Sequence, residues 1–343
     1  MAKISGIKKI LISRTDAIGD VMLALPLAGL LKEMFGKDLK VAFFGKTYTF
    51  DVINTCEYVD EFYNYDTFNN FDQSGKVSFL KEIGADVILH VFPREAIASA
   101  ARQAGIPHRI GTTNRLYHIW NCNHLVSFSR KNSTLHEAQL NTFLLKDLGL
   151  IEIPTIEKLA SLYGFTKLSP LPVKFADRLK DTKFKLILHP GSNASAREWN
   201  KVHYRDLMRY LPADKVQIII TGTENELSGL NEWLSSLPDN VISFVGRLEL
   251  VELISLINNC DGLIAASTGP LHIASALGKH ALGIFPPIRP MHPGRWAPIG
   301  KLAEVAVVKK ACSDCRTEPQ KCHCINEISA TEIADRVTTW LNK

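Results

Sequence analysis

Short apolar runs alternate with longer amphipathic stretches along almost the whole chain, and this alternation constrains the fold more than any other feature of the sequence. The runs are rich in Val and Ile, and each is about as long as one β-strand. The stretches between them are long enough to form helices. Apolar strands that alternate with helices form parallel sheets covered on both faces. We therefore predict an α/β fold.

The alternation runs through two halves of similar length. The predicted strands cover residues 9–13, 39–44, 86–92 and 108–111, and then 186–189, 216–221, 241–245, 262–266 and 281–285. The predicted helices cover residues 20–35, 94–104 and 134–148, and then 202–211, 224–237, 248–259, 271–277 and 330–341. Residues 169–172, Ser-Pro-Leu-Pro, interrupt the pattern because proline resists helix and holds the chain extended. We predict two doubly wound domains, residues 1–168 and 169–343.

Composition excludes several other classes of protein. A chain of 343 residues suits two domains of ~150 residues each, and 46% hydrophobic with 22% charged residues excludes a disordered chain. The net charge of +5 suits anionic small molecules or an anionic membrane surface, and it is too low to predict nucleic-acid binding. Residues 1–12 lack the pattern of a signal peptide, and the uncharged apolar stretch 21–31 is too short to span a bilayer. We therefore expect a cytoplasmic protein.

The loops that follow the predicted strands are where we expect the functional residues, because such sheets bind ligands at the carboxyl ends of their strands. The first of them, Arg14-Thr15-Asp16-Ala17-Ile18-Gly19-Asp20, lacks the G-x-G-x-x-G pattern of the usual dinucleotide loop. A carboxylate such as Asp20 at this edge can act as a general base. Alternatively, Asp20 only complements the dipole of the helix that begins there.

A second loop, residues 189–199, follows the first strand of the second half. Its small residues expose backbone N–H groups, Ser192 and Asn193 add polar side chains, and Arg197 adds a planar cationic fork. These are the components of a phosphate-binding cradle. The alternative is a polar turn in which Trp199 packs against the core.

Two further loops of the second half also carry polar residues after a strand. Thr223 and Glu226 have the spacing of a capping box, which leaves Glu224 available to bind ribose hydroxyls. Residues 267–272, Ser-Thr-Gly-Pro-Leu-His, precede a helix whose free N–H groups favour a diphosphate. His272 in its first turn faces either this ligand or the core.

Taken in order, these loops resemble those of glycosyltransferase family 9, the ADP-heptose:lipopolysaccharide heptosyltransferases. The resemblance runs along nearly the whole chain. It includes residues 10–26 with Gly19-Asp20-Val21, residues 105–111 with Gly-Ile-Pro-His-Arg-Ile-Gly, and residues 136–149. Residues 267–274, Ser-Thr-Gly-Pro-Leu-His-Ile-Ala, are its most specific part.

The resemblance implies a GT-B architecture, in which two Rossmann-like doubly wound domains face each other across a cleft. The N-terminal domain would bind the acceptor, and the C-terminal domain would bind an ADP-sugar donor. The implied reaction transfers a heptose or a related sugar, inverts the anomeric centre and requires no metal. The implied acceptor is an anionic glycolipid or oligosaccharide of the lipopolysaccharide core. Peripheral contact with the inner membrane surface is therefore also expected.

The resemblance also assigns roles to individual residues. Asp20 stands at the position of the family's catalytic base. Ser267 replaces an aspartate that many members carry, which leaves the identity of the sugar and the nucleotide open. The implied donor-binding residues are Ser192, Asn193, Arg197, Glu224, Thr268, Gly269 and His272, and the candidate acceptor contacts are Arg94, Arg109 and Arg115.

Four of the seven cysteines lie close together near the C-terminus: Cys312, Cys315, Cys322 and Cys324. They provide enough ligands for a tetrahedral structural zinc, although their spacing differs from the Cys-x2-Cys pairs of zinc ribbons. The alternative is a group of reduced or partly oxidised packing thiols. We expect no cofactor in catalysis and no catalytic role for these cysteines.

Two other functions remain as alternatives. A nucleotide-sugar epimerase or isomerase can have the same two-domain plan and would need no acceptor. A non-catalytic, zinc-stapled binding protein is suggested by Ser267. The inverting glycosyltransferase is our leading prediction.

Overall fold

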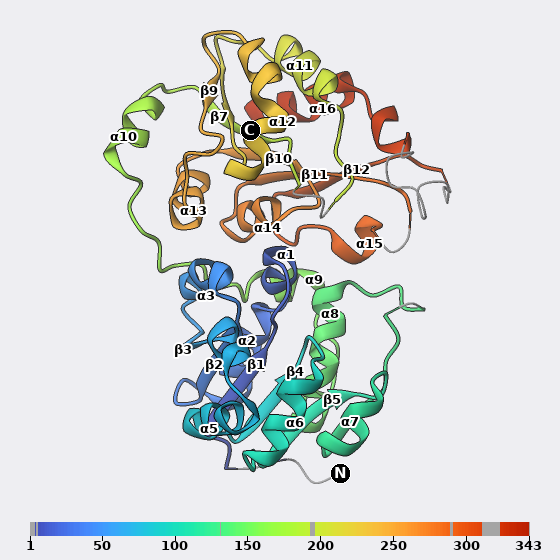
Figure 1. The fold of residues 1–343 in the computed structure, drawn as a ribbon. Helices are drawn as coiled ribbons and strands as arrows, with labels where there is room; N and C mark the ends of the chain where they lie inside the picture. The colour runs from blue at the N-terminus through green and yellow to red at the C-terminus, as the bar shows by residue number, and fades with distance from the viewer. Residues whose placement is uncertain are drawn as a thin grey trace. The chain divides into compact units, whose positions relative to one another are not determined.

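The computed structural model describes residues 4, 6–130, 132–192, 196–288, 291–310 and 323–342 of the 343-residue chain. The chain divides into two compact units, residues 1–167 (unit 1) and 168–343 (unit 2). Each unit is a parallel β-sheet with helices on both faces (Figure 1). The predicted α/β fold is confirmed in both halves of the chain.

The sheet of unit 1 has the strand order β3-β2-β1-β4-β5-β6, and every neighbouring pair is parallel. Its order reverses between β1 and β4, which is the point where open α/β sheets bind ligands. The strands are β1 (Lys9–Ser13), β2 (Lys40–Gly45), β3 (Glu61–Asn64), β4 (Val87–His90), β5 (His108–Thr112) and β6 (His124–Val126).

The helices of unit 1 cover this sheet from both sides. Helices α4, α5 and α6 pack on one face, where Leu11 of β1 and Phe44 of β2 share an apolar core with Leu80 and Ile97. Helices α2, α8 and α9 contact one another on the other face (Figure 1). The helices are α1 (Ile18–Met22), α2 (Pro26–Phe35), α3 (Phe50–Thr55), α4 (Tyr65–Asn70), α5 (Gln73–Ile83), α6 (Glu95–Gln103), α7 (Leu116–Asn121), α8 (Glu137–Thr142) and α9 (Ile156–Ala160).

Unit 2 repeats this plan, with the parallel strand order β12-β11-β10-β7-β8-β9. The order reverses between β7 and β10, so the loops after these two strands have the ligand-binding position. The strands are β7 (Phe184–His189), β8 (Val216–Ile220), β9 (Ile242–Ser243), β10 (Gly262–Ala266), β11 (His280–Phe285) and β12 (Ala303–Val307). The helices are α10 (Val173–Ala176), α11 (Lys201–Tyr210), α12 (Glu224–Ser235), α13 (Leu250–Asn258), α14 (Gly269–Ala276), α15 (Pro293–Trp296) and α16 (Ala330–Leu341).

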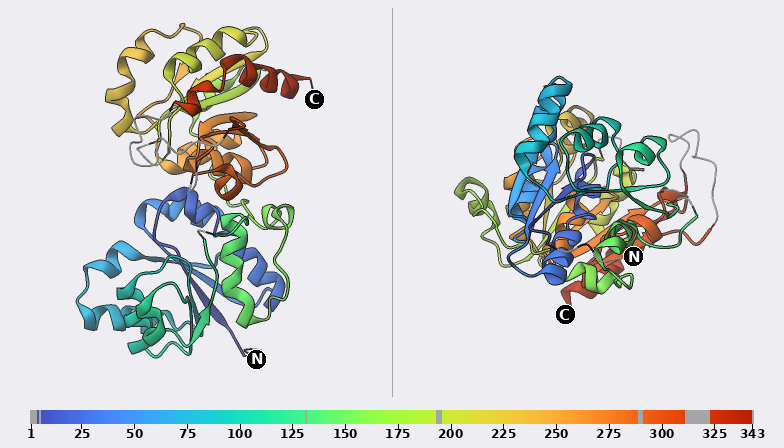
Figure 2. Two further views of the ribbon diagram at one scale, coloured as in Figure 1. Left: turned by 90° about the vertical axis from the view of Figure 1, so that its right-hand side faces the viewer. Right: turned by 90° about the horizontal axis from the view of Figure 1, so that it is seen from below.

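Trp199 anchors the loop after β7 in the core of unit 2. Its side chain is buried, and its Nε1 donates a hydrogen bond to the carbonyl oxygen of Ile328 at 2.9 Å. Helices α11 and α16 pack side by side over this region (Figure 2), and Tyr204 and Trp340 from these helices belong to the same apolar core. Trp199 therefore has the packing role that the sequence allowed for it.

The structure corrects several of the predicted elements. The predicted helix 134–148 is α8 followed by a 3-10 helix, and the helices not predicted are α3, α4, α5, α7, α9, α10 and α15. The predicted helix 20–35 is two helices, α1 and α2, because Pro26 has no N–H group and stands at the start of the second helix. Strands β3, β6 and β12 were not predicted. Each is short or only partly buried, and none shows the continuous apolar pattern of the central strands.

Two buried histidines lie beside each other in unit 1. His90, the last residue of β4, is fully buried, and neither of its ring nitrogens has a hydrogen-bond partner among the described residues. The ring of His118 from α7 lies 5.3 Å away, centroid to centroid. Burial lowers the pKa of His90 to about 3, and the nearby His118 and Arg109 contribute to this effect. The ring is therefore neutral in the folded protein.

We predict that His90 makes unit 1 less stable in acid. Unfolded histidine binds a proton below pH ~6.5, whereas folded His90 stays neutral down to about pH 3. Stability is complete above pH ~6.5 and should fall by about 1 kcal/mol per pH unit between roughly pH 6 and pH 4. His90→Leu should remove this part of the slope in urea unfolding, whereas His203→Leu, at a partly exposed position, should keep it. Equal slopes for wild type and His90→Leu would contradict this account.

Candidate active site

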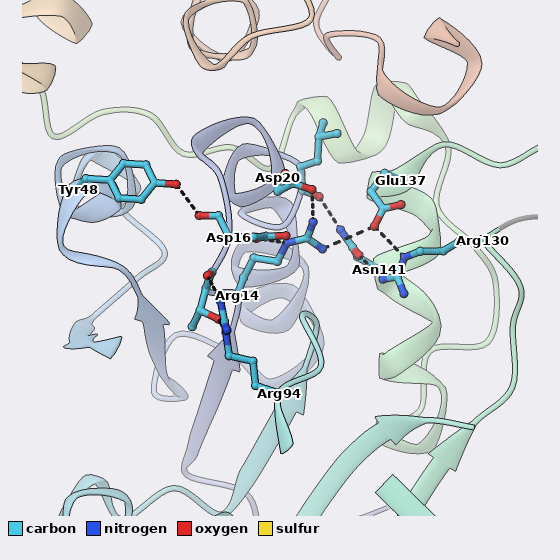
Figure 3. A network of polar contacts seen from close by, with 10 residues as sticks. Arg14, Asp16, Asp20, Tyr48, Arg94, Arg130, Glu137 and Asn141 are labelled. Atoms are coloured by element: carbon cyan, nitrogen blue, oxygen red, sulfur yellow. Dashed lines mark hydrogen bonds and ion pairs between the residues drawn. The ribbon is translucent and has the colours of Figure 1, made fainter. Parts of the chain in front are cut away.

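Arg14 is the centre of an ionic network at the carboxyl end of β1 (Figure 3). Its side chain is only 3% exposed. Its Nε lies 2.8 Å from Oδ1 of Asp16, one terminal nitrogen contacts Oδ1 of Asp20, and the other lies 3.5 Å from Oε1 of Glu137. One guanidinium thus binds three carboxylates, one on each nitrogen atom, which the arginine fork permits and a lysine ammonium does not.

Two of these carboxylates come from the first turns of helices. Asp20 lies in the first turn of α1, whose N-cap is Ala17. Glu137 is the first residue of α8, and His136 caps this helix by accepting a hydrogen bond from the N–H of Ala138 at 3.2 Å. A helix N-terminus stabilises negative charge, so both positions suit an acidic residue. The two helix starts together bring their carboxylates to Arg14.

Glu137 is 1% exposed, and a second arginine helps to neutralise it. Arg130 Nε lies 2.9 Å from Glu137 Oε1, and a terminal nitrogen of Arg130 lies 3.4 Å from Oδ1 of Asn141. The amide of Asn141 donates in turn to the carbonyl oxygen of Leu23 at 3.1 Å. Because a buried carboxylate without a cation is costly, the two arginines together stabilise Glu137 in the interior. The network also ties α8 to the turn that follows α1.

The charges of the network act on one another. Burial raises the pKa of Asp16 to about 6, Arg14 opposes this rise, and Asp20 adds to it. Although burial works against the charge of Arg14, Asp16, Asp20 and Glu137 together raise its pKa above the ordinary value. Arg14 therefore remains a cation while it serves three anions.

Asp20 is the most exposed carboxylate of the three. Its side chain is 24% exposed, against 17% for Asp16 and 1% for Glu137. Arg14 holds Oδ1, and Oδ2 makes no hydrogen bond to any described residue. Asp20 thus offers one oxygen at the edge of the sheet where ligands bind in this fold, and this oxygen can accept a proton from a hydroxyl group.

The loop between β1 and α1 is held by two further side chains. Arg94, which follows β4, donates from Nε to the hydroxyl of Thr15 at 2.6 Å and from a terminal nitrogen to the Thr15 carbonyl oxygen at 3.0 Å. The hydroxyl of Tyr48 donates to the carbonyl oxygen of Asp16 at 2.8 Å. The structure therefore brings the predicted Arg94 to this loop, where it supports the backbone.

In unit 2, Ser192 lies in the loop after β7 and binds a carboxylate of its own loop. Its N–H and its hydroxyl donate to Oε1 of Glu198 at 2.9 and 2.8 Å. The two donors expected to bind a phosphate thus hold another anion in the structure. Arg197 is partly buried in the same loop, and Asn193 lies outside the described residues.

Thr268 stands at the start of α14, directly after β10. It is 5% exposed, its hydroxyl does not cap the helix, and Oγ1 has no hydrogen-bond partner among the described residues. Helix α14 begins at Gly269, and the N–H groups at a helix start favour an anion. His272 is buried one turn further on. An unsatisfied hydroxyl and a helix N-terminus thus meet at the carboxyl end of β10.

Glu226 of α12 contacts the loop after β7. Its carboxylate accepts hydrogen bonds from the N–H of Thr223 at 2.7 Å and from the Thr223 hydroxyl at 3.0 Å, which confirms the capping box. It also packs on Gly191, where a Cβ would lie 2.3 Å from Glu226 Oε1. Glu224 is exposed in the first turn of α12.

The structure does not bring Arg109 and Arg115 to the Arg14 network. Arg109 lies near the start of β5, where its Nε donates to the carbonyl oxygen of Asn121 at 2.7 Å. Arg115 is the exposed N-cap of α7. Arg109 therefore lies toward the amino end of its strand, whereas Arg115 follows the carboxyl end of β5 and makes no contact with the Arg14 network among the described residues.

The cysteine cluster is described only in part. Cys324 is buried at the start of a short 3-10 turn, and Cys312, Cys315 and Cys322 lie outside the described residues. Within the described ranges, no group of three or more His, Cys, Asp or Glu side chains is arranged to hold a metal ion.

Sequence reasoning did not assign Arg14, Arg130 or Glu137 to the site. One usable signal was the end of the predicted strand 9–13, because Arg14 follows it directly and Asp16 and Asp20 lie in the same loop. A second signal was the isolated position of Glu137. Residues 96–136 contain no Asp or Glu, and Glu137 is the first acidic residue after this interval and stands at a predicted helix. No local pattern pairs Arg14 with Glu137, since the two are far apart along the chain.

Comparisons with known proteins match the chain to one family. The family model "Glycosyltransferase family 9 (heptosyltransferase)" matches residues 81–326. A Haemophilus influenzae protein assigned as a glycosyltransferase is 28% identical over 302 residues, which cover 85% of this chain and 86% of that protein.

Two solved structures have a similar fold. The match to a family 9 glycosyl transferase from Veillonella parvula covers 99% of each chain, with a TM-score of 0.82 and 16% identity. The match to the Escherichia coli ADP-heptose lipopolysaccharide heptosyltransferase II covers 97% of this chain and 98% of the other, with a TM-score of 0.76 and 18% identity. These likenesses establish the GT-B type of fold, and the family model establishes the kinship. The chain therefore belongs to glycosyltransferase family 9, the heptosyltransferase family, and is a glycosyltransferase.

Proposed function

We propose that this enzyme transfers a heptose or a related sugar from an ADP-sugar to an anionic acceptor of the lipopolysaccharide core type, with inversion and without a catalytic metal ion. The family and the name of the Escherichia coli structural neighbour support this choice. The observation that carries it is Asp20, a partly exposed carboxylate held by the buried Arg14 at the carboxyl end of β1.

We assign the acceptor to the N-terminal domain and the donor to the C-terminal domain. The first assignment is supported by Asp20, because the base must lie beside the hydroxyl that it deprotonates. The second is supported by the unsatisfied hydroxyl of Thr268 and the start of α14, both suited to a diphosphate. The exposed Glu224 is the proposed partner of the ribose.

In the proposed reaction, Asp20 takes the proton of the acceptor hydroxyl as the hydroxyl oxygen attacks the anomeric carbon. The bond from this carbon to the diphosphate oxygen breaks, and its electron pair leaves with ADP. Attack on the side opposite to the leaving group inverts the centre. Arg14 orients Asp20, and because it also serves Asp16 and Glu137, its single charge is shared among three carboxylates.

The departing diphosphate gains negative charge and needs donors. The hydroxyl of Thr268, the N–H groups at the start of α14 and the guanidinium of Arg197 are the proposed donors. One donor aimed at developing charge typically lowers a barrier by ~3 kcal/mol. The donors of Ser192 hold Glu198, so a phosphate bound there would replace the Glu198 carboxylate.

We place the enzyme in the cytoplasm at the inner face of the membrane, in keeping with a glycolipid acceptor. Across the described residues, the structure contains no helix with the length and apolar character to cross a bilayer.

Metal analysis of the purified protein distinguishes a structural zinc from packing thiols at the four clustered cysteines.

The first prediction about the reaction concerns the base. Asp20→Asn keeps the shape and an oxygen for Arg14 but cannot take a proton, so sugar transfer should slow about 10²- to 10⁴-fold in a single-turnover assay. ADP binding, measured by thermal shift, should not change, because unit 2 supplies the donor contacts. Asp16→Asn is the matched control on the same guanidinium and should lose far less activity. An equal loss in both variants would contradict the assignment, and donor conversion without acceptor would favour an epimerase.

The second prediction concerns the shared guanidinium. In Arg14→Lys, one ammonium cannot bind all three carboxylates, so kcat should fall while KM for the donor stays near the wild-type value. Unfolding free energy should drop by roughly 2–4 kcal/mol, because Glu137 loses part of its neutralisation. Adding Glu137→Gln should restore part of this stability but not kcat. If the second substitution lowers stability further, Glu137 is not the destabilising charge.

The third prediction concerns the diphosphate site. Thr268→Val keeps the side-chain shape and removes a hydroxyl that has no partner in the described structure, so stability should change little. The Kd for ADP, measured by calorimetry, should rise about tenfold through loss of one hydrogen bond to a charged group. Thr221→Val is the control, because its hydroxyl lies 2.9 Å from His189 Nδ1, and it should lose stability rather than ADP affinity. Unchanged ADP affinity in Thr268→Val would remove Thr268 from the donor site.

A further inference from the structure

Helix α7 turns an apolar face to solvent. Leu116, Ile119 and Trp120 are 72%, 51% and 64% exposed, whereas His118 is fully buried. The spacing i, i+3, i+4 places the three apolar residues on one side of the helix. Surface helices normally show the reverse arrangement, with the apolar side toward the core. This face therefore requires an explanation outside the folding of unit 1.

Strand β6 extends this face. Leu125 pairs in register with Gly111 of the neighbouring parallel strand, so the two residues point to the same side of the sheet. Helix α7 lies on that side, because a Cβ on Gly111 would be 2.7 Å from Nδ1 of His118. Leu125 is 39% exposed. We call Leu116, Ile119, Trp120 and Leu125 the α7 patch.

Arginines lie at both ends of α7. Arg115 is its exposed N-cap, and Arg102, also exposed, donates to the carbonyl oxygen of Trp120 at 3.0 Å. Residues 96–136 contain no acidic residue, and the acid that precedes this interval is Glu95, at the start of α6. Two acids from outside this interval come near the patch: Asp147 lies 3.1 Å from His124, the neighbour of Leu125, and the charge of Glu95 acts on Tyr117. The interval itself is cationic.

We propose that the α7 patch docks on the anionic surface of a lipid bilayer. Its apolar side chains would enter the interface, with Trp120 at the level of the headgroups, where tryptophan is enriched. Arg102 and Arg115 would contact lipid phosphates while their stems cover apolar surface. Apolar burial and attraction to anionic lipids together drive such binding. The excess of arginines over acids in the interval 96–136 is what favours this occupant over a protein. The proposal rests on the proposed function in one respect, that the acceptor is a glycolipid.

The test is sedimentation of the full chain with vesicles of phosphatidylethanolamine and phosphatidylglycerol, compared with vesicles of phosphatidylcholine alone. We expect binding to the anionic vesicles that weakens in high salt. The double variant Leu116→Ser, Trp120→Ser should bind about tenfold more weakly or less. The matched control is Val202→Ser, Tyr210→Ser, which removes two exposed apolar side chains of α11, 46% and 57% exposed, and should bind as wild type does.

Trp120 provides a second measurement that does not depend on the serine variant. It is the only tryptophan in the sequence of unit 1. Brominated lipids should quench part of the wild-type fluorescence. Trp120→Phe keeps an aromatic ring, so it should still bind vesicles but lose this quenching.

Several outcomes would overturn the docking proposal. These are no vesicle binding, equal binding to neutral vesicles, or equal binding by wild type and the double serine variant. A dimer that dissociates in that variant, without vesicle binding, would assign the patch to a second copy of the chain. Sugar transfer to a delipidated, soluble acceptor separates the docking proposal from the proposed function. This transfer needs no membrane, so the double serine variant should retain it. Failure of this transfer in a wild-type protein that binds vesicles would count against the proposed function alone.

Discussion

The ion pairs of Arg14 are the interaction on which the candidate active site depends. The guanidinium is buried at the end of a central strand, where a lone charge could not remain, and Asp16, Asp20 and Glu137 make it stable there. Each anion in turn depends on the cation. Because Glu137 begins α8 and Asp20 lies in α1, the same charge also holds two helices at the carboxyl edge of the sheet. Stability and the position of Asp20 therefore come from one set of contacts.

Unit 2 has the same topology, and hydrogen-bond donors gather at the corresponding edge. Backbone N–H groups, the hydroxyls of Ser192 and Thr268 and the start of α14 all favour an anion. Glu198 already occupies the donors of Ser192, which shows that this loop can bind an oxyanion. The same fold thus places the partly exposed Asp20 at this edge in unit 1 and donors suited to an anion at this edge in unit 2. A reaction that deprotonates one substrate and releases a diphosphate from another needs both.

Much of the fold could be predicted from the chain, and the misses have physical causes. The central strands are continuous apolar runs and were found, whereas β3, β6 and β12 lie at sheet edges, where burial is partial and the pattern weak. The break between α1 and α2 depends on Pro26, which the apolar pattern masked. At the site, Asp20 was predicted from its place after a strand. Its partner Glu137 was missed because it lies far along the chain.

The sequence by itself determined the two parallel sheets and the family, because strand and helix periodicity and short motifs are properties of neighbouring residues. Only the tertiary structure decided that Arg14 serves three carboxylates, that Glu226 packs against Gly191, and that α7 presents its apolar side to solvent. Each of these depends on contacts between segments that are distant in sequence. Such contacts are set by how the layers pack, and no local pattern encodes them.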